Sequence, residues 1–342
     1  MGKLERGIVV GIAAAAVMMA FRQRRRKNRA TSFSGKVALI TGGSRGLGLE
    51  LARRLANEGA KVAICARDLD ELERAKADLE ARGADVLILP IDVTDPGHAE
   101  EIARSVEELL GPIDILINNA GVIQVGPMDQ MRHEDYEEAM RLHFWAPLYL
   151  TEAVVSGMRE RRAGRIVNIA SIGGKIGVPH LLPYCSSKFA LVGFTEGLRA
   201  ELAEDGIYVT CACPGLMRTG SHVHAKFKGQ QEKEYTWFSI GNATPLLSIS
   251  SGEAAEIILN ACRHGDAEVI FPLSARIGTL ANGLVPGLTQ DVMAIVNRLL
   301  PGPEGGHLEA KAGAEVRPEN LPSFLTGLSD EAIVPNNELP AT

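Results

Sequence analysis

Cysteines, long hydrophobic runs and, outside one short cluster, basic residues are scarce in this chain of 342 residues. Five cysteines are too few for a disulfide scaffold at this length, and they fit a reducing compartment. The apolar run at residues 7–21 would span roughly 22 Å as a helix, short of the ~30 Å hydrocarbon core of a bilayer. Hydrophobic residues nevertheless make up 46 % of the chain, which excludes disorder throughout.

Basic residues are concentrated near the N-terminus. Six of the 36 lie between Arg22 and Arg29, which leaves 30 basic against 42 acidic residues in the rest of the chain. An acidic body repels phosphate polyanions, so we expect no nucleic-acid binding by the main domain. We also expect no metal site, because the Cys211/Cys213 pair and the His222/His224 pair lack further ligands at metal-site spacing.

Residues 1–30 combine the apolar run with this basic cluster. A signal peptide carries its charge before the apolar run, and the myristoylation pattern wants Ser or Thr where Arg6 stands. A membrane anchor at residues 7–21 fits best, with the basic cluster and the main domain on the cytoplasmic side. The alternatives are an extension lying on a membrane surface or on the protein, and a soluble cytoplasmic protein.

Seven short apolar runs alternate with amphipathic helical stretches over residues 31–275. Continuous apolar runs are typical of strands buried on both faces, and their alternation with helices predicts an α/β fold. We expect a doubly wound sheet of about seven parallel strands with helices on both faces. The predicted strands are 37–40, 62–65, 86–89, 113–118, 165–170, 207–213 and 268–271.

The pattern changes after Pro272. Residues 276–300 are apolar and interrupted at Pro286 and Gly287, which predicts two short helices packed on the domain or on a membrane surface. Residues 301–342 contain six prolines, seven acidic and two basic residues. This composition predicts a disordered acidic tail.

A glycine-rich segment, TGGSRGLG (41–48), follows the first predicted strand and opens a helix. Gly42, Gly46 and Gly48 permit a tight turn and a close approach of the backbone to a pyrophosphate at the helix N-terminus. The position between strand and helix favours dinucleotide binding over packing alone.

The spacing TGxxxGxG resembles the short-chain dehydrogenase/reductase family, and the resemblance extends over residues 36–272. Further motifs follow in the family's order: Asp92-Val93, NNAG (118–121), Ser171, the YxxxK pair Tyr184/Lys188, and PGLMRT (214–219). The resemblance implies a Rossmann-like catalytic domain that binds a nicotinamide dinucleotide. The predicted cofactor-binding residues are Gly42, Ser44, Arg45, Gly46, Leu47, Gly48, Arg67, Asp92, Val93, Asn119, Ala120, Gly121, Tyr184, Lys188, Pro214, Gly215, Met217 and Thr219.

Charge at the end of the second strand predicts which dinucleotide binds. Relatives that prefer NAD carry an acid there for the ribose hydroxyls, and this chain has Ala66 followed by Arg67. Arg45 lies within the glycine-rich turn. Two guanidinium groups near the ribose favour a 2′-phosphate, which predicts NADP(H), although Asp68 opposes this slightly.

The family resemblance also implies a catalytic group. Tyr184 would exchange a proton with the substrate oxygen, Ser171 would orient that oxygen, and Lys188 would bind the nicotinamide ribose. Lys188 follows Tyr184 by one helical turn. A cation ~4 Å away would lower the pKa of the phenol by ~3 units from its usual ~10.

His143 occupies the position where the family usually has an Asn that supports a water relay. The imidazole is bulkier and titrates near pH 6.5. Three alternatives stay open: the relay runs through His143, the relay is weakened, or His143 is a packed core residue.

A long segment, residues 220–245, falls where the family places its substrate lid. Its aromatic residues Phe227, Tyr235, Trp237 and Phe238 would supply apolar walls, which favours a lipophilic ketone or alcohol. Its lysines would attract an acidic group or be solvated.

We therefore expect an NADP(H)-dependent oxidoreductase that interconverts a carbonyl and a secondary alcohol on a small, apolar substrate. The alternative is a non-catalytic NADP(H)-binding sensor or scaffold at a membrane. By analogy with the family, residues 134–161 and 184–204 would pair two copies into a homodimer, or four into a homotetramer.

Overall fold

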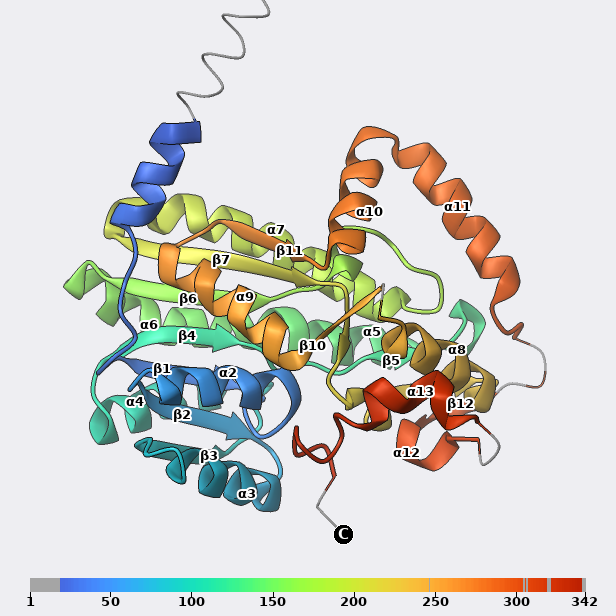
Figure 1. The fold of residues 1–342 in the computed structure, drawn as a ribbon, viewed down its shortest axis with the longest axis horizontal. Helices are drawn as coiled ribbons and strands as arrows, with labels where there is room; N and C mark the ends of the chain where they lie inside the picture. The colour runs from blue at the N-terminus through green and yellow to red at the C-terminus, as the bar shows by residue number, and fades with distance from the viewer. Residues whose placement is uncertain (1–18, 246, 304, 306, 319–320, 340–342) are drawn as a thin grey trace, which may run out of the picture.

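The computed structural model describes residues 19–245, 247–303, 305, 307–318 and 321–339. Its centre is a seven-stranded sheet, shown in Figure 1, made of β1 (Val37–Thr41), β2 (Lys61–Ala66), β3 (Val86–Pro90), β4 (Ile113–Asn118), β6 (Gly164–Ile169), β7 (Ile207–Pro214) and β11 (Glu268–Phe271). The spatial order is β11-β7-β6-β4-β1-β2-β3, and every neighbouring pair is parallel. Each strand lies on a predicted apolar run, so the doubly wound α/β fold is confirmed.

Helices cover both faces of this sheet because successive residues of each strand point to opposite sides and both sets are apolar. Ala38 and Ile40 pack with the side of α2 (Gly46–Asn57), α3 (Leu69–Glu80) and α9 (Ser251–His264). Val37 and Leu39 pack with the side of α4 (Pro96–Leu109), α6 (Ala146–Arg161) and α7 (Leu182–Leu202). The helix α5 (His133–Met140) continues into α6 through a π-helical turn, η2 (Arg141–Trp145).

The order of the strands reverses between β1 and β4, so the crevice at their carboxyl ends is the expected ligand-binding position of such a sheet. Local sequence positions the helices around it. Asp68 caps α3 by accepting from the Glu71 N–H, and Ser250 and Glu253 form a capping box at the start of α9. In contrast, α2 begins without a side-chain cap.

A smaller unit, which we name the cap, lies beside the carboxyl edge of the main sheet (Figure 1). Its sheet pairs β9 (Lys226–Gly229) with β5 (Gln124–Val125) and β12 (His307–Ala312), and its helices are α8 (Gln231–Ala243), α12 (Gly313–Val316) and α13 (Ser323–Asp330). A two-stranded sheet of β8 (Leu216–Arg218) and β10 (Ser248–Ser250) lies nearby in the chain. Short 3-10 turns are η1 (Met128–Gln130), η3 (Ile172–Gly174), η4 (Ala203–Asp205) and η5 (Ser221–Val223).

The structure differs here from the predicted disordered tail. Described residues after 301 form β12, α12 and α13, because β12 finds an unpaired edge on β9 and Val316 is buried in the apolar core of the cap. The polar composition of the tail hides these few apolar anchors.

The apolar segment 276–300 forms a protruding hairpin of two helices, α10 (Leu273–Leu284) and α11 (Pro286–Leu299), as Figure 1 shows. The predicted interruption is confirmed, with Pro286 in the first turn of α11. Only Ala275 is buried among its residues, whereas Leu284 is 72 % and Leu299 82 % exposed. The hairpin therefore presents its apolar side chains outward.

Residues 19–28 are helical and leave the body from one edge of the main sheet (Figure 1). Arg26 of the basic cluster is bound to the Asp266 carboxylate through two nitrogens, at 2.8 Å each. Among the described residues, no helix has the length and apolar character needed to cross a bilayer. The predicted anchor at 7–21 falls largely outside these residues.

Candidate active site

The turn after β1 is compact because its glycines have no room for a side chain. A Cβ on Gly48 would lie 2.1 Å from the Gly42 carbonyl oxygen, and one on Gly42 would lie 2.9 Å from the Cα of Ala120. Gly42 and Gly46 have φ of 60° and 57°, a region that favours glycine. The Asn119 amide donates to the Gly42 carbonyl at 3.0 Å. These contacts hold the turn against the end of β4.

The helix α2 begins directly after this turn. Its N-cap residue, Arg45, makes no side-chain hydrogen bond to the first backbone N–H groups of the helix. Such N–H groups and the positive end of the helix dipole favour phosphate groups. The glycine-rich turn at residues 41–48, which we name the glycine cradle, and the start of α2 together fit the pyrophosphate of a dinucleotide.

Two predicted cofactor residues in the turn are bound to an acid that sequence analysis missed. Arg45 forms an ion pair with Glu71 of α3 at 2.5 Å, and the Ser44 hydroxyl donates to the same carboxylate at 3.0 Å. Glu71 is 9 % exposed and lies in the first turn of α3. A 2′-phosphate at this position would compete with Glu71 for Arg45.

Arg67 and Asp92 lie just after the neighbouring strands β2 and β3. Arg67 is exposed. Burial acts to raise the pKa of Asp92, but hydrogen bonds from Thr94 and the charges of Arg67 and His98 hold this pKa below its usual value. The Asp92 carboxylate accepts from the Thr94 N–H at 2.9 Å and from its hydroxyl at 2.8 Å.

Ser171, Tyr184 and Lys188, which we name the Ser–Tyr–Lys group, meet at the carboxyl end of β6. Ser171 is the N-cap residue of η3, and its hydroxyl accepts from the Gly173 N–H at 3.0 Å. Tyr184 and Lys188 are one turn apart on α7, with the Lys188 ammonium 5.7 Å from the centre of the Tyr184 ring. That ammonium donates to the Ile169 carbonyl at 2.8 Å.

The structure does not show the lowered pKa that sequence analysis expected for Tyr184. Burial raises the pKa of Tyr184 to about 12, and a hydrogen bond with Ser171 acts in the opposite direction. Burial also lowers the pKa of Lys188 to about 8. The expectation left out the desolvation of the phenol, which is the largest influence on its pKa here.

The arrangement of glycine turn, β4 end and Ser–Tyr–Lys group agrees with comparisons to known proteins. The sequence model described as short chain dehydrogenase matches residues 36–229, more than half of the chain. The chain belongs to the short-chain dehydrogenase family.

Several known short-chain dehydrogenases are similar to this chain. The dehydrogenase/reductase SDR family protein 7-like of Anopheles gambiae is 35 % identical over 269 residues, which cover 77 % of this chain and 83 % of that protein. L-sorbose reductase of Gluconobacter frateurii, solved with NADPH and L-sorbose, is 30 % identical with a TM-score of 0.63, covering 70 % of this chain and 95 % of its own. A variant of actinorhodin polyketide ketoreductase, solved with NADPH, is 32 % identical with a TM-score of 0.60, covering 70 % and 97 %.

His143, the departure from the family's usual Asn, lies in the π-helical turn η2 and is 1 % exposed. Its Nε2 accepts from the Val122 N–H at 3.2 Å, and its Nδ1 lies 2.8 Å from the Ser187 hydroxyl, which donates to the Tyr184 carbonyl. Nδ1 therefore carries the proton, and both ring nitrogens are in use. Burial first, and then the charge of Lys188, lower the pKa of His143 well below its usual value. This geometry favours the packed core residue among the three alternatives.

The segment PGLMRT begins at the last residue of β7, the strand next to β6, after which Ser171 lies. The Gly215 N–H donates to the Phe271 carbonyl at 2.7 Å, and residues 216–218 form β8. Thr219 is 4 % exposed, and its hydroxyl donates to Ser221 at 2.7 Å. Its carbonyl accepts from the side chain of Asn336, a residue outside every predicted motif.

The aromatic residues of segment 220–245 do not form the expected walls of a substrate pocket. Phe227 and Tyr235 are fully buried and pack with Phe238 and Val316 in the core of the cap. The three side chains fill the cap because its small sheets need an apolar interior of their own. Trp237 packs against this core as a half-buried residue, and its indole N–H donates to Glu234 at 2.6 Å.

The lysines of the same segment are mostly paired. Lys228 is bound to Asp135 at 2.5 Å in a buried position, and Lys226 is bound to Glu138 at 2.6 Å. Lys233 is exposed. Two of the three lysines therefore hold the cap against α5 and do not face a substrate.

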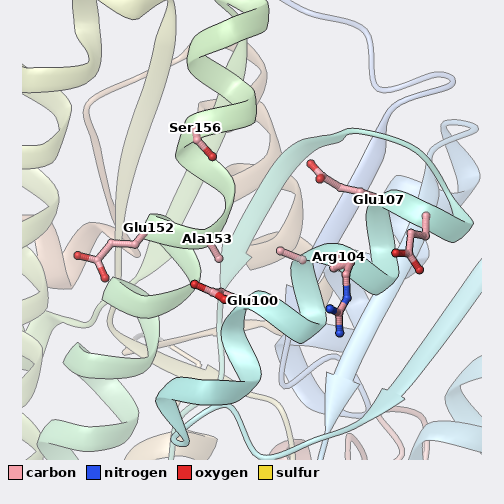
Figure 2. A pocket seen from close by; sticks show the side chains of 8 residues that line it. Glu100, Arg104, Glu107, Glu152, Ala153 and Ser156 are labelled. Carbon is pink, nitrogen blue, oxygen red and sulfur yellow. The ribbon is translucent and has the colours of Figure 1, made fainter.

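A groove of about 510 Å³ lies between α4 and α6, and Figure 2 shows its lining. Four of its eight lining residues are glutamates (Glu100, Glu107, Glu108 and Glu152). None of the eight is a predicted site residue. The groove is an acidic hollow on the helical face, separate from the candidate site.

The buried pair Cys211 and Cys213 has its sulfur atoms 3.6 Å apart on β7. Glu268 of β11 lies close enough to join them as a third possible metal ligand. Lys175 is ion-paired with Glu268, so the carboxylate already has a cation. Both cysteines pack in an apolar cluster with Leu191 and Val192.

Proposed function

We propose that the chain is an NADP(H)-dependent reductase that converts a ketone into a secondary alcohol. The observation that carries this proposal is the Ser–Tyr–Lys group at the carboxyl end of β6, because the glycine cradle after β1 lies at the carboxyl edge of the same sheet. The dinucleotide supplies the hydride to the carbonyl carbon when it is bound.

The residues of the chain supply the proton and orient the oxygen. Ser171 would donate a hydrogen bond to the carbonyl oxygen, and Tyr184 would give its phenolic proton to that oxygen as negative charge develops. A phenol with a pKa of about 12 is fully protonated near neutrality, which suits an acid better than a base. Tyr184 is therefore proposed as the acid of the reduction step. Lys188, held by Ile169, stabilises the phenolate that remains.

The preference for NADP(H) rests on Arg45 and Arg67 near the expected ribose and on the absence of an acid at Ala66. The two solved relatives described above contain NADPH. Glu71 works against this preference because it already binds Arg45. Comparable kcat/KM for NADPH and NADH would contradict the proposal.

We propose a lipophilic substrate and association with a membrane on the basis of the hairpin, since the aromatic residues of the cap no longer support them. The hairpin exposes a row of large apolar residues, among them Leu280, Leu284 and Leu288 at more than 60 % exposure each. The basic residues of the helix at 19–28 would bind anionic lipids.

The proposed function is tested by following NADPH oxidation with a panel of ketones. The panel pairs long-chain and cyclic apolar ketones with L-sorbose, a polar ketose. We expect turnover of the apolar members. Turnover confined to the sugar would refute the substrate class, and no turnover with retained NADPH binding would favour the non-catalytic sensor. Flotation of the full chain with anionic vesicles tests the membrane proposal, with neutral vesicles as the control.

A further inference from the structure

The last described residues of the chain, 331–339, return to the start of α2, and we name them the strap. Figure 1 shows this C-terminal segment beside the carboxyl ends of β1 and β2. The Gly46 N–H, the first of the helix, donates to the Asn336 carbonyl at 2.9 Å. The strap thus uses the backbone donor that the glycine-rich turn offers to a ligand.

Asn337 binds the strap to the other side of the turn. Its amide nitrogen donates to the Ser44 carbonyl at 2.8 Å and to the Glu71 carbonyl at 3.0 Å. Its amide oxygen accepts from the Arg74 guanidinium at 2.8 Å. Asn337 has φ of 56°, a conformation that Asn adopts more readily than most residues.

Glu338 places a carboxyl group in the glycine cradle. A Cβ on Gly46 would lie 2.8 Å from Glu338 Oε1, so the Glu338 carboxyl group fills the space that a side chain at position 46 would need. Glu338 Oε2 lies 3.3 Å from the Arg45 guanidinium and 3.4 Å from His224 Nε2. This oxygen is buried and has no hydrogen-bond partner among the described residues. The strap therefore points a buried carboxyl group into the cradle, and one oxygen of that group lacks a hydrogen-bond partner among the described residues.

Four predicted cofactor contacts are occupied by the strap at once. Ser44 and Thr219 give their carbonyls to it, Gly46 gives its N–H, and Arg45 faces its carboxyl group. A dinucleotide whose phosphates lie at the start of α2 needs the same groups and the same space.

The strap is anchored at its beginning and free of apolar burial at its end. Asp330, the residue before it, is bound by His222 at 3.0 Å, Arg317 at 2.8 Å and Thr326 at 2.7 Å. Within the strap the contacts to the turn are polar, and Leu339 is 39 % exposed. Polar contacts exchange readily for water, so the segment can detach as far back as Asp330.

We propose that the strap is an internal competitor of the dinucleotide, so that cofactor binding requires its release. This rests on the proposed function, because it takes the cradle to be the cofactor site. The apparent affinity for NADPH is then reduced by the fraction of molecules with the strap closed.

The test uses the full chain and NADPH. The double variant Asn337→Ala/Glu338→Ala removes the contacts to Ser44, Glu71 and the cradle, and we expect it to lower the Kd for NADPH about tenfold. The matched control Glu331→Ala/Leu339→Ala changes two exposed residues of the same strap, and its Kd should stay within about twofold of wild type. A higher Kd in the double variant would mean that the strap clamps the cofactor, which overturns the proposal.

Hydrogen exchange of the same proteins separates the two claims. When NADPH is added to wild type, we expect amides of the glycine-rich turn to gain protection and amides of 336–338 to lose it. Gain of protection in both segments overturns the strap proposal and leaves the proposed function standing. If wild type does not bind NADPH, binding by the double variant supports the proposal, and no binding by either refutes both.

Discussion

The Ser–Tyr–Lys group and the glycine-rich turn lie at the same edge of the central sheet, but different parts of the chain complete them. Ser171 lies between β6 and η3, Tyr184 and Lys188 lie on α7, the next α-helix, and the contacts of Ser171 and Lys188 run to backbone atoms of the same region. The turn is completed by Glu71 and by the strap, which follows it by about 290 residues. Under the proposed function, the proton-donating half of the site needs no change of partners, whereas the nucleotide half exchanges the strap for the dinucleotide.

Apart from substitutions of Tyr184 itself, removal of the Lys188 charge should lower kcat most. In Lys188→Met the phenolate left after proton transfer loses its cation, and we expect kcat to fall about a hundredfold. Steady-state NADPH oxidation measures this. Lys175→Met, a nearby lysine bound to Glu196 and Glu268, serves as the control and should keep kcat within about threefold. An equal loss of kcat in the two variants would show that the charge of Lys188 has no special role beside Tyr184.

Arg45→Ala tests the nucleotide half. We expect kcat/KM for NADPH to fall about thirtyfold and that for NADH to change little, because a charge-assisted contact to a 2′-phosphate is lost. Arg82→Ala, an arginine at the exposed end of α3, should leave both values unchanged. Equal losses for the two cofactors would place Arg45 away from the 2′-phosphate.

The pH dependence of NADPH binding should separate the halves further. Burial raises the pKa of Glu338 from 4.5 to about 8, with Arg45 opposing and Glu71 reinforcing the shift. The closed strap therefore holds the proton more tightly than the open one, and it loses stability as pH rises from 4.5 to about 8. Burial, and then the charge of Arg45, lower the pKa of His224, which also faces Glu338.

The ratio of the NADPH Kd of wild type to that of Glu338→Gln isolates this group. Between pH 5.5 and 7.5 we expect the ratio to fall by about tenfold and to level off above pH 8. A ratio that stays constant across this range would show that Glu338 does not titrate with strap opening.

His143→Asn should have the smallest effect on catalysis. Because both nitrogens of His143 are engaged by Val122 and Ser187, we expect kcat to stay within about threefold and the pH profile to keep its shape. The free energy of unfolding, measured by urea denaturation, should fall by about 1–2 kcal/mol because the substitution removes the buried hydrogen bonds of the imidazole. A shifted pH profile would restore His143 to a proton relay.

Sequence patterns predicted the sheet well because each strand is buried by its immediate helices. The runs at 113–118 and 268–271 coincide with β4 and β11. The glycine-rich turn was predictable for the same reason, since Gly42 and Gly48 need close approach to a neighbour supplied by the adjoining strand.

Sequence patterns failed where distant segments meet. The sequence predicted Phe227 and Tyr235 as walls of a substrate pocket. In the structure they are buried in the core of the cap with Val125 of β5 and with Val316. The strap resembles a disordered tail because its binding depends on a few polar groups, Asn336, Asn337 and Glu338, whose partners lie far away in the chain. No local periodicity marks such contacts.

The central claim is that Tyr184 donates the proton beside a bound dinucleotide. Single-turnover oxidation of bound NADPH by a ketone, compared between wild type and Tyr184→Phe, tests it most directly. The account predicts a rate at least about a thousandfold lower in Tyr184→Phe, with the Kd for NADPH within about threefold of wild type. A rate close to that of wild type with NADPH bound would contradict it.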